Sequence, residues 1–222
     1  MTADDLISEL VRDLEPVTPL PPPGTRALRW TLAAVVTGGL VIGVFGVRPD
    51  IVLASATIPF QAHMSLLALA ALTAALAALT LAVPGEDLSQ WRRALPVLAA
   101  MTWGVWVAAE LGLAVAAGAA TALHIDRGWH CITLAMAVGA VPAALLFWMV
   151  SRGAVLDGRK AAMFAGLAAA GVGALGVEII CPKIAPMHLF VWHVAPVLAW
   201  TVIAAVAGAS ALKSTTSSRV PD

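Results

Sequence analysis

Charged side chains are scarce in this sequence. Of its 222 residues, 12% are Asp, Glu, Lys or Arg, whereas 60% are hydrophobic and the mean hydropathy is +0.91. A soluble domain carries about 25% charged residues, and disordered segments combine low hydrophobicity with high charge. The composition therefore excludes a soluble domain, and it excludes disorder for the bulk of the chain. It predicts a polytopic membrane protein.

The sequence also has no net charge and only two cysteines. The 13 Lys and Arg residues balance 13 Asp and Glu residues, and a net charge of zero argues against direct binding of nucleic acid. Two cysteines are too few for a disulfide-dense secreted scaffold. The apolar runs are continuous rather than alternating, which excludes a transmembrane β-barrel.

Long uncharged runs predict six transmembrane helices. A helix needs about 20 apolar residues to cross the hydrocarbon core, and lipid requires a backbone that satisfies its own hydrogen bonds. The expected spans are residues 28–47, 62–83, 94–118, 130–150, 161–180 and 188–212. The predicted fold is therefore all-α, a six-helix transmembrane bundle over residues 26–212 with a short tail at 213–222.

The positions of Lys and Arg predict the orientation of this bundle. With the N-terminus in the cytoplasm, ten of these side chains lie inside, and only Arg48, Arg127 and Lys183 lie outside. Such an excess is typical of cytoplasmic loops. We therefore expect both termini to be cytoplasmic. We expect no cleavable signal peptide, because the first 25 residues are acidic and Pro-rich.

Residues 1–25 form an acidic leader with a net charge of −4 up to residue 24. Thr2 and Asp5 fit a capping box at a helix start. The following apolar side chains recur at helical spacing, and they are Leu6, Ile7, Leu10, Val11 and Leu14. A stiff Pro-rich strap follows over residues 16–24. We expect a docking helix for a cytoplasmic partner with a basic, apolar-lined groove. The alternative, a helix resting on the membrane, is disfavoured because the inner leaflet is anionic.

The two cysteines are predicted to lie at one depth. Cys131 opens the fourth span and Cys181 closes the fifth, so the hairpin between them returns the chain to the outer side. Neighbouring helices of a hairpin satisfy the limit of about 7 Å between the Cα atoms of a disulfide, and the periplasm is oxidising. The alternative is that both thiols are inert small hydrophobes.

All five histidines also fall in the outer half of the predicted bundle. They are His63, His124, His130, His188 and His193. Because thiolate and imidazole suit zinc or copper, His130, His188 and His193 are candidate metal ligands with Cys131 and Cys181. Two observations weigh against a metal site: no CxxC or HExxH spacing is present, and His188 and His193 differ by five residues, which is not one helix face. The pair would converge only if His188 preceded the helix.

Two carboxylates fall within the spans. Glu110 is the only charge in the third span, and Glu178 lies near the end of the fifth. Intramembrane carboxylates are functional candidates by default, although a hydrogen-bonded group packed between helices would explain them equally well.

The chain resembles a known family in the order of several short motifs. These are Asp4-Asp5-Leu6-Ile7-Ser8-Glu9-Leu10, Pro16-Val17-Thr18-Pro19-Leu20, Arg26, Gly128-Trp129-His130-Cys131, Glu178-Ile179-Ile180-Cys181-Pro182, His188 and Trp192-His193. With six spans, they resemble the NrsF-type anti-sigma factors, negative regulators of extracytoplasmic-function sigma F in proteobacteria. The resemblance covers essentially the whole chain.

This resemblance implies a bacterial inner-membrane regulator rather than an enzyme. The leader would hold an extracytoplasmic-function sigma factor at the membrane through Asp4, Asp5, Leu6, Ile7, Glu9, Leu10 and Leu14. Cys131 and Cys181 look like the family's paired periplasmic cysteines, linked to sensing heavy-metal or oxidative stress. Because the leader is too short to be a whole anti-sigma domain, the loops 84–93 and 151–160 are expected to share the contact.

Two other classes stay open at this point. A membrane thiol oxidoreductase, or a haem or quinone protein, would use the same outer Cys and His residues, but thiol relays need a second pair or a CxxC motif. A small transporter would need polar, discontinuous helices near the midplane, and only Glu110 supports it.

Overall fold

The computed structural model describes residues 2–12, 19–85, 89–119, 122–125 and 127–217. Six helices are long and apolar enough to cross a membrane. They are α2 (Pro23–Phe45), α4 (Ile58–Thr80), α5 (Gln90–Ala116), α6 (Trp129–Ser151), α7 (Gly158–Ile180) and the last span Pro186–Leu212, which comprises α8 (Pro186–Leu189), η1 (Phe190–Val194) and the start of α9 (Ala195–Ser217). Two short helices, α1 (Ala3–Arg12) and α3 (Ile51–Ser55), complete the described part of the chain. The predicted all-α fold with six spans is confirmed.

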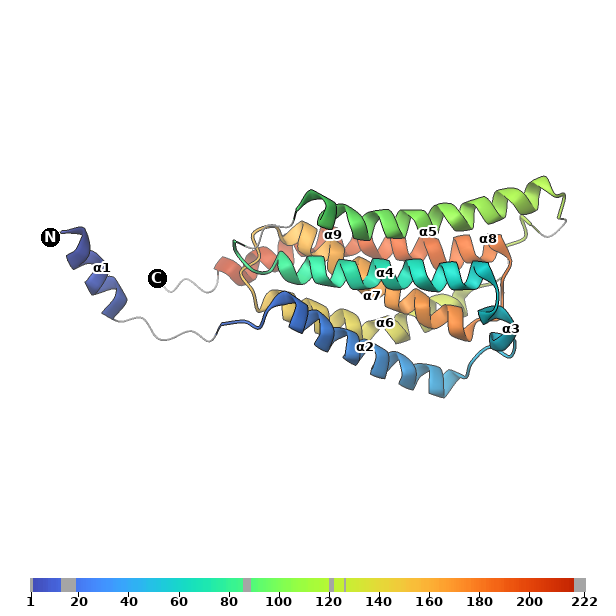
Figure 1. The fold of residues 1–222 in the computed structure, drawn as a ribbon, viewed down its shortest axis with the longest axis horizontal. Helices are drawn as coiled ribbons and strands as arrows, with labels where there is room; N and C mark the ends of the chain where they lie inside the picture. The colour runs from blue at the N-terminus through green and yellow to red at the C-terminus, as the bar shows by residue number, and fades with distance from the viewer. Residues whose placement is uncertain (1, 13–18, 86–88, 120–121, 126, 218–222) are drawn as a thin grey trace.

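The six spans run alternately up and down one elongated bundle (Figure 1). One end, which we call the terminus end, carries the start of α2, the end of α9 and the loops after α4 and α6. The opposite end, which we call the cysteine end, carries residues 46–57, 117–119, 122–125, 127–128 and 181–185. Cys131 and Cys181 both lie at the cysteine end, as the hairpin argument predicts.

Helix α7 is the centre of the bundle, because it packs against α9, α4 and α6. Its small residues allow these neighbours to approach closely. Ala161, Ala165, Ala169 and Gly173 recur every four positions along α7, and all four are buried. By contrast, Gly39 on α2 has no heavy atom of another element near its Cβ position. Close packing in this bundle therefore concentrates on α7.

Gly173 gives the first testable prediction. An added Cβ would lie 2.5 Å from the carbonyl oxygen of Ala135 on α6, and a backbone atom has little freedom to move away. We expect Gly173→Ala to lower the free energy of unfolding by about 1–3 kcal/mol, the usual cost of overpacking. Thermal unfolding in detergent measures the loss. The matched control, Gly39→Ala, should unfold at or above the wild-type temperature, and equal behaviour of both variants would contradict the argument.

The leader helix α1 begins with the predicted capping box. The Thr2 backbone N–H donates to the Asp5 carboxylate at 2.7 Å, and the Asp5 N–H donates to the Thr2 hydroxyl at 3.3 Å. The side chains of Leu6, Ile7 and Val11 are exposed. Figure 1 shows α1 standing away from the bundle. Its apolar face therefore has no partner within the described part of this chain.

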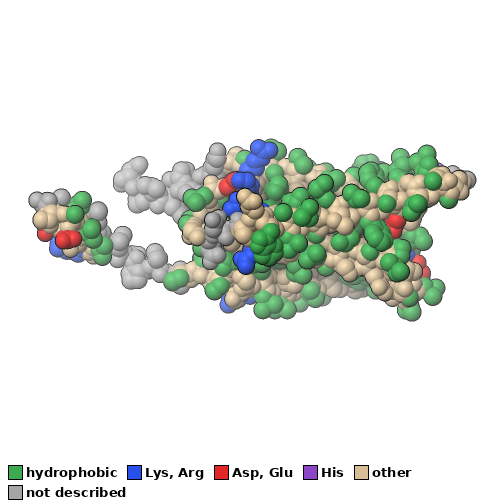
Figure 2. Space-filling view, turned by 45° about the horizontal axis from the view of Figure 1, so that its top comes forward, with side chains coloured by type: hydrophobic (Ala, Val, Ile, Leu, Met, Phe, Trp, Pro, Cys, Tyr) green, Lys and Arg blue, Asp and Glu red, His purple; other side chains and the backbone are tan. Residues whose placement is uncertain are grey.

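Lys and Arg side chains gather at the terminus end, while the visible middle of the bundle is largely hydrophobic (Figure 2). Arg26, although buried, donates from Nη2 to the carbonyl of Met149 at this end. Beyond it, the Ala154 N–H donates to the carbonyl of Ala82 at 3.0 Å, which holds the loops after α4 and α6 side by side. The loops after α4 and α6 are thus joined at the end of the bundle where Lys and Arg gather.

Candidate functional site

The first sulfur of the site is placed by a helix start. Gly128 precedes α6, and its Cα lies against Trp192, so that a Cβ there would come within 2.2 Å of the indole. Trp129 packs edge-on against the same indole, with ring centroids 5.2 Å apart. Cys131 follows in the first turn of α6 and is buried. Two of the motifs that carry the family resemblance therefore contact one another.

The second sulfur is placed by a proline. Residues that precede proline avoid the helical region, and Cys181, which precedes Pro182, has extended backbone angles of φ −83° and ψ 121°. Helix α7 therefore ends at Ile180, and the Cys181 side chain turns toward α6. The backbone N–H of Arg48 donates to the carbonyl of Ile179 at 3.0 Å and ties the loop after α2 to this end of α7.

The two histidines converge through a π-helical turn. In an α-helix, residues five positions apart point about 140° away from each other. In η1 the Ala195 N–H instead donates to the carbonyl of Phe190, five residues back, and this wider turn brings His188 and His193 together. Their ring centroids are 5.6 Å apart. The expectation that His188 must precede the helix is wrong, because His188 lies within α8. π-turns inside helices often occur at functional sites.

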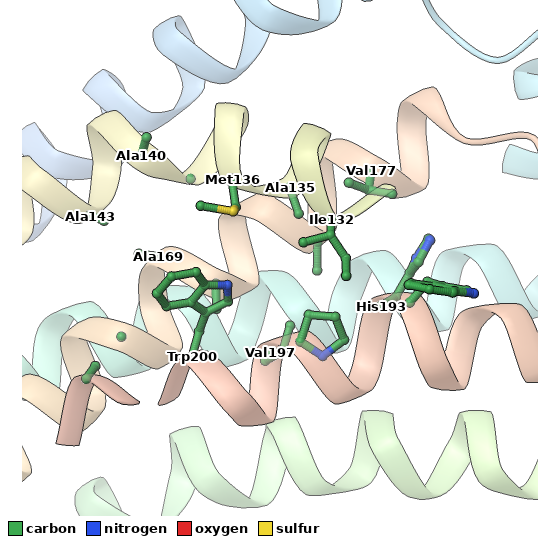
Figure 3. A pocket seen from close by; sticks show the side chains of 17 residues that line it. Ile132, Ala135, Met136, Ala140, Ala143, Ala169, Val177, His193, Val197 and Trp200 are labelled. Carbon is green, nitrogen blue, oxygen red and sulfur yellow. The ribbon is translucent and has the colours of Figure 1, made fainter. Parts of the chain in front are cut away.

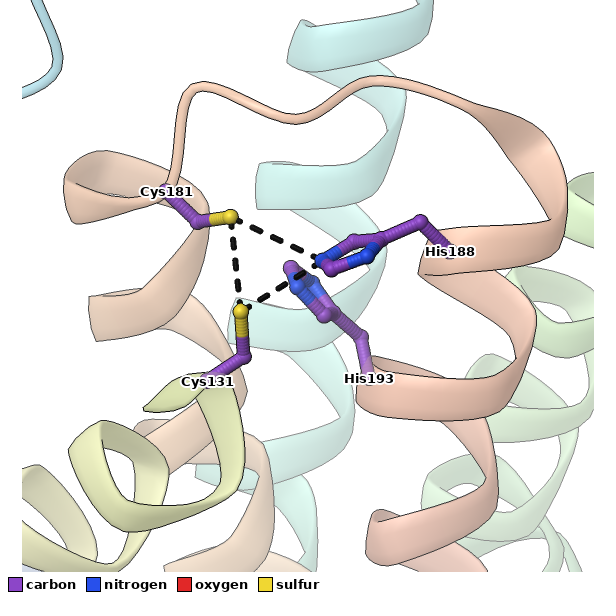
Figure 4. A group of neighbouring side chains, drawn as sticks. All are labelled: Cys131, Cys181, His188 and His193. Carbon is purple, nitrogen blue, oxygen red and sulfur yellow. Dashed lines mark hydrogen bonds between the residues drawn. The ribbon is translucent and has the colours of Figure 1, made fainter. Parts of the chain in front are cut away.

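Four buried side chains meet at this point, namely Cys131, Cys181, His188 and His193 (Figure 4). Their candidate ligand atoms all lie within 4.8 Å of one another. The two Sγ atoms are 3.5 Å apart, and His188 Nε2 lies 3.4 Å from Cys131 Sγ and 3.7 Å from Cys181 Sγ. Both cysteines are free thiols. We call these four residues the Cys2His2 cluster.

The spacing of the cluster fits a tetrahedral metal ion. Zn–S bonds of about 2.3 Å and Zn–N bonds of about 2.0–2.1 Å place two sulfurs about 3.8 Å apart and a sulfur and a nitrogen about 3.6 Å apart. The observed separations match these values within a few tenths of an ångström. His193 Nε2 is buried and has no hydrogen-bond partner among the residues that the structure describes. The cluster therefore supplies four suitable donors, one of which has nothing else to bind.

One of the two thiols, that of Cys181, also has an environment suited to this role. The Cys131 thiol hydrogen-bonds to Cys181 and lowers the pKa of the Cys181 thiol. Thiolate is the form that binds metals and reacts with oxidants. The arrangement therefore favours a reactive sulfur at the end of α7.

A carboxylate orients one of the two rings. Glu178 Oε1 lies 3.1 Å from His193 Nδ1, and both side chains are almost fully buried. A proton on Nδ1 satisfies this bond and leaves Nε2 as the lone-pair nitrogen. Metal-binding histidines commonly pair their other ring nitrogen with a carboxylate in this way.

The same carboxylate connects to two more helices. His63 on α4 lies 3.7 Å from Glu178 Oε1 through Nδ1 and 3.4 Å from Glu110 Oε2 through Nε2. Glu110 on α5 in turn accepts a hydrogen bond of 2.7 Å from the Trp106 indole. The two intramembrane carboxylates noted in the sequence therefore belong to one buried polar chain. Sequence spacing does not reveal it, because His63 and Glu178 are 115 positions apart.

Arg48 closes the cysteine end beside the cluster. Its side chain is buried, and Nε and Nη2 donate to the Asp50 carboxylate at 2.7 and 2.8 Å. This bidentate pair lowers the pKa of the Asp50 carboxyl. The Arg48 guanidinium also interacts electrostatically with Glu178 and Cys181, after its stronger interaction with Asp50.

An apolar pocket of about 230 Å³ adjoins the cluster between α6, α7 and α9 (Figure 3). Small residues form most of its wall, with Met136 and Trp200 as the larger side chains. Of the described residues that line it, only His193 is titratable. The groups of the cysteine end that can bind a metal or react with an oxidant therefore belong to the Cys2His2 cluster, whereas the pocket wall is mainly apolar.

Several residues that the sequence predicts as site residues lie outside the Cys2His2 cluster. His130 is exposed, and its ring faces Phe45 with centroids 6.4 Å apart, so the structure does not bring it to the cluster. His124 is exposed as well. In the leader, Asp4, Asp5, Leu6, Ile7 and Glu9 are exposed on α1. The side chain of Leu10 and all of Leu14 fall outside the described part of the chain.

Comparison with known proteins agrees with this description. The family model NrsF, described as negative regulator of sigma F, matches residues 10–213, which is nearly the whole chain. No curated protein and no solved structure matches the chain. The chain, with its six long apolar helices, belongs to the NrsF family of negative regulators of sigma F.

Proposed function

We propose that this protein holds an extracytoplasmic-function sigma factor at the bacterial inner membrane and releases it when a heavy-metal ion or an oxidant reaches the Cys2His2 cluster. The observation that carries the proposal is the cluster itself, four buried donors at one end of a regulator's membrane bundle. The leader and both ends of the described chain lie at the other end (Figure 1). Input and output would therefore be separated by the length of the bundle.

The proposed orientation places the terminus end in the cytoplasm. It is supported by the gathering of Lys and Arg at that end, because such residues are enriched in cytoplasmic loops. In this orientation residues 1–25 form the cytoplasmic docking segment, residues 26–212 form the transmembrane domain, and residues 213–222 form a cytoplasmic tail. The cysteine end then faces the periplasm, where metals and oxidants arrive first.

The leader is proposed to bind the sigma factor with its apolar face and its carboxylates. Leu6 and Ile7 are exposed without a described partner, and Asp4, Asp5 and Glu9 lie on the same short helix. A basic surface that otherwise contacts DNA or RNA polymerase complements such a helix. The loops 84–93 and 151–160 would complete the contact, although residues 86–88 of the first loop lie outside the described part of the chain.

The cluster offers two kinds of input. A soft metal ion would be held by Cys131, Cys181, His188 and His193, and a large ion would move the four donors apart. Alternatively, the two thiols, 3.5 Å apart, would each give up one hydrogen to a peroxide, which is reduced to two waters as the S–S bond forms. Either event would change the spacing of α6, α7 and η1. The metal ion or the disulfide would therefore favour one arrangement of these helices over the other, as a two-state switch requires.

The proposal does not need a catalytic step. The rival thiol oxidoreductase would pass electrons to a second thiol pair, and this chain contains two cysteines in all. Among the open alternatives, the family assignment therefore favours the regulator.

A transcription reporter tests the sensing. In cells that carry the chain, its sigma factor and a sigma-dependent promoter, cadmium should raise reporter output by about 5–150-fold, the range of ordinary coupling energies. The double variant Cys131→Ser/Cys181→Ser should insert normally and stay repressed, because neither metal nor oxidant finds a thiol. Immunoblotting of membranes controls for insertion. A double variant that still responds to cadmium like the wild type would overturn the proposed input.

A further inference from the structure

We infer that Glu178 is a positioning residue of the metal site and that His63 and Glu110 anchor it to helices α4 and α5, which contribute no metal ligand. The inference rests on the proposed metal input and adds the residues that regulate it. It starts from the contacts among the buried side chains of His193, Glu178 and His63 and the half-buried side chain of Glu110.

The first step concerns the His193 ring. It can rotate about its side-chain bonds, and only one ring orientation directs Nε2 at the two sulfurs. Glu178 selects that orientation by holding Nδ1 at 3.1 Å. Without the carboxylate, the buried Nδ1–H would lose its partner, and the ring would no longer be fixed. The position of the fourth donor thus depends on a side chain that does not touch the metal.

The second step concerns the Glu178 carboxylate. Its side chain is 4% exposed within a membrane-spanning helix, where a charge is costly unless it is paired. His63 on α4 provides a second imidazole at 3.7 Å, and Glu110 on α5 faces the other nitrogen of that ring at 3.4 Å. Imidazoles and carboxylates therefore alternate in the order His193, Glu178, His63 and Glu110. Each carboxylate has a histidine neighbour.

The third step concerns how these contacts connect the metal site to helix α5. Helix α5 buries few side chains, namely Pro96, Ala99, Trp103 and Val107, and it packs mainly on α4. Interhelical polar contacts hold membrane helices together. Helix α5 joins this series of polar contacts through Glu110, which lies next to His63 of α4. Helix α4 ends at Thr80 and α5 begins at Gln90, both at the terminus end. A shift of His193 on metal binding thus has a direct physical route to the loop that is proposed to share the sigma contact.

Cobalt binding to the purified full-length protein in detergent tests the inference. Co²⁺ reports tetrahedral geometry by its visible absorption, and competition with a coloured chelator gives its Kd. We expect Glu178→Leu to weaken binding by about 10–100-fold, the usual effect of removing the carboxylate partner of a metal-binding histidine, and to change the absorption bands. Glu178→Gln keeps an oxygen acceptor for Nδ1–H and should recover most of the affinity and the wild-type bands.

Asp157→Asn is the matched control, because Asp157 is a carboxylate at the opposite end of α7, where it accepts a hydrogen bond from the Lys160 backbone N–H that asparagine can also accept. Its Kd should stay close to that of the wild type. Glu178→Leu with the wild-type Kd and bands would overturn the inference, while wild-type protein that binds no cobalt would refute the proposed metal site and the inference with it. Because the wild type is measured first, these two failures are distinguishable. A loss that Glu178→Gln does not recover would also overturn the positioning role.

Discussion

Single replacement of Cys131 or Cys181 by serine should abolish tight tetrahedral binding of Co²⁺ or Zn²⁺. Each sulfur is one of four donors in the Cys2His2 cluster, and serine does not supply a thiolate. Removing a carboxylate that only orients a ligand costs about 10–100-fold in affinity. Loss of a ligand itself should therefore exceed about 100-fold, and the sulfur-to-cobalt charge-transfer absorption should weaken in each single variant and disappear in the double variant. Absorbance titration of the purified protein measures both effects.

His130→Ala is the matched control for this experiment. His130 is adjacent to Cys131 in sequence and is a ligand candidate by sequence alone, yet it is exposed and faces Phe45. The variant should bind cobalt with the wild-type affinity and spectrum. If His130→Ala were as damaging as Cys131→Ser, the ligand set drawn from the structure would be incorrect. Unchanged cobalt binding by either cysteine variant would remove the sulfur ligands from the site.

Leu6→Asp in the leader should release the sigma factor without any inducer. Burial of a leucine contributes about 1.5–3 kcal/mol, and a factor of ten in Kd corresponds to about 1.4 kcal/mol. The loss of the leucine alone therefore weakens the complex by about 10–100-fold, and a carboxylate in an apolar groove adds a further desolvation cost. The fraction of sigma factor that co-purifies with the membranes, together with reporter output, measures the release.

Ser8→Asp separates charge from hydrophobic contact in the same helix. Ser8 lies on the side of α1 opposite to the apolar face at helical periodicity, and it is exposed. This variant adds the same negative charge, so it should retain the sigma factor. Equal release by Ser8→Asp and Leu6→Asp would point to net charge rather than to the apolar face. Complete retention by Leu6→Asp would exclude this face as the docking surface.

The fold could be predicted from composition because the membrane imposes a simple requirement on sequence. Uncharged runs long enough to cross the bilayer must be helical, and their number follows from where charges interrupt them. The local details were also readable where a single residue type restricts the backbone. Thr2 and Asp5 form the expected capping box, and Pro182 ends α7 so that Cys181 leaves the helix.

The composition of the site could be predicted only in part. Cys131 and Cys181 were predictable partners because a hairpin returns the chain to the same depth. His188 and His193 were candidate ligands by residue type, but their spacing of five, which places them on different faces of an α-helix, argued against their convergence. The π-turn at Phe190–Val194 removes that objection. His130 is the converse case, since its position next to Cys131 directs it to another face of α6.

The scarcity of charge by itself determined that this chain is a six-span membrane bundle, because few charges can be buried in lipid and their positions mark the ends of the helices. Which of the remaining polar groups meet was decided only by the tertiary structure. Glu178, His63 and Glu110 come from three different helices, and His193 joins them through an irregular turn. Such contacts depend on how whole helices pack and rotate against each other, and no local spacing in the sequence records that rotation.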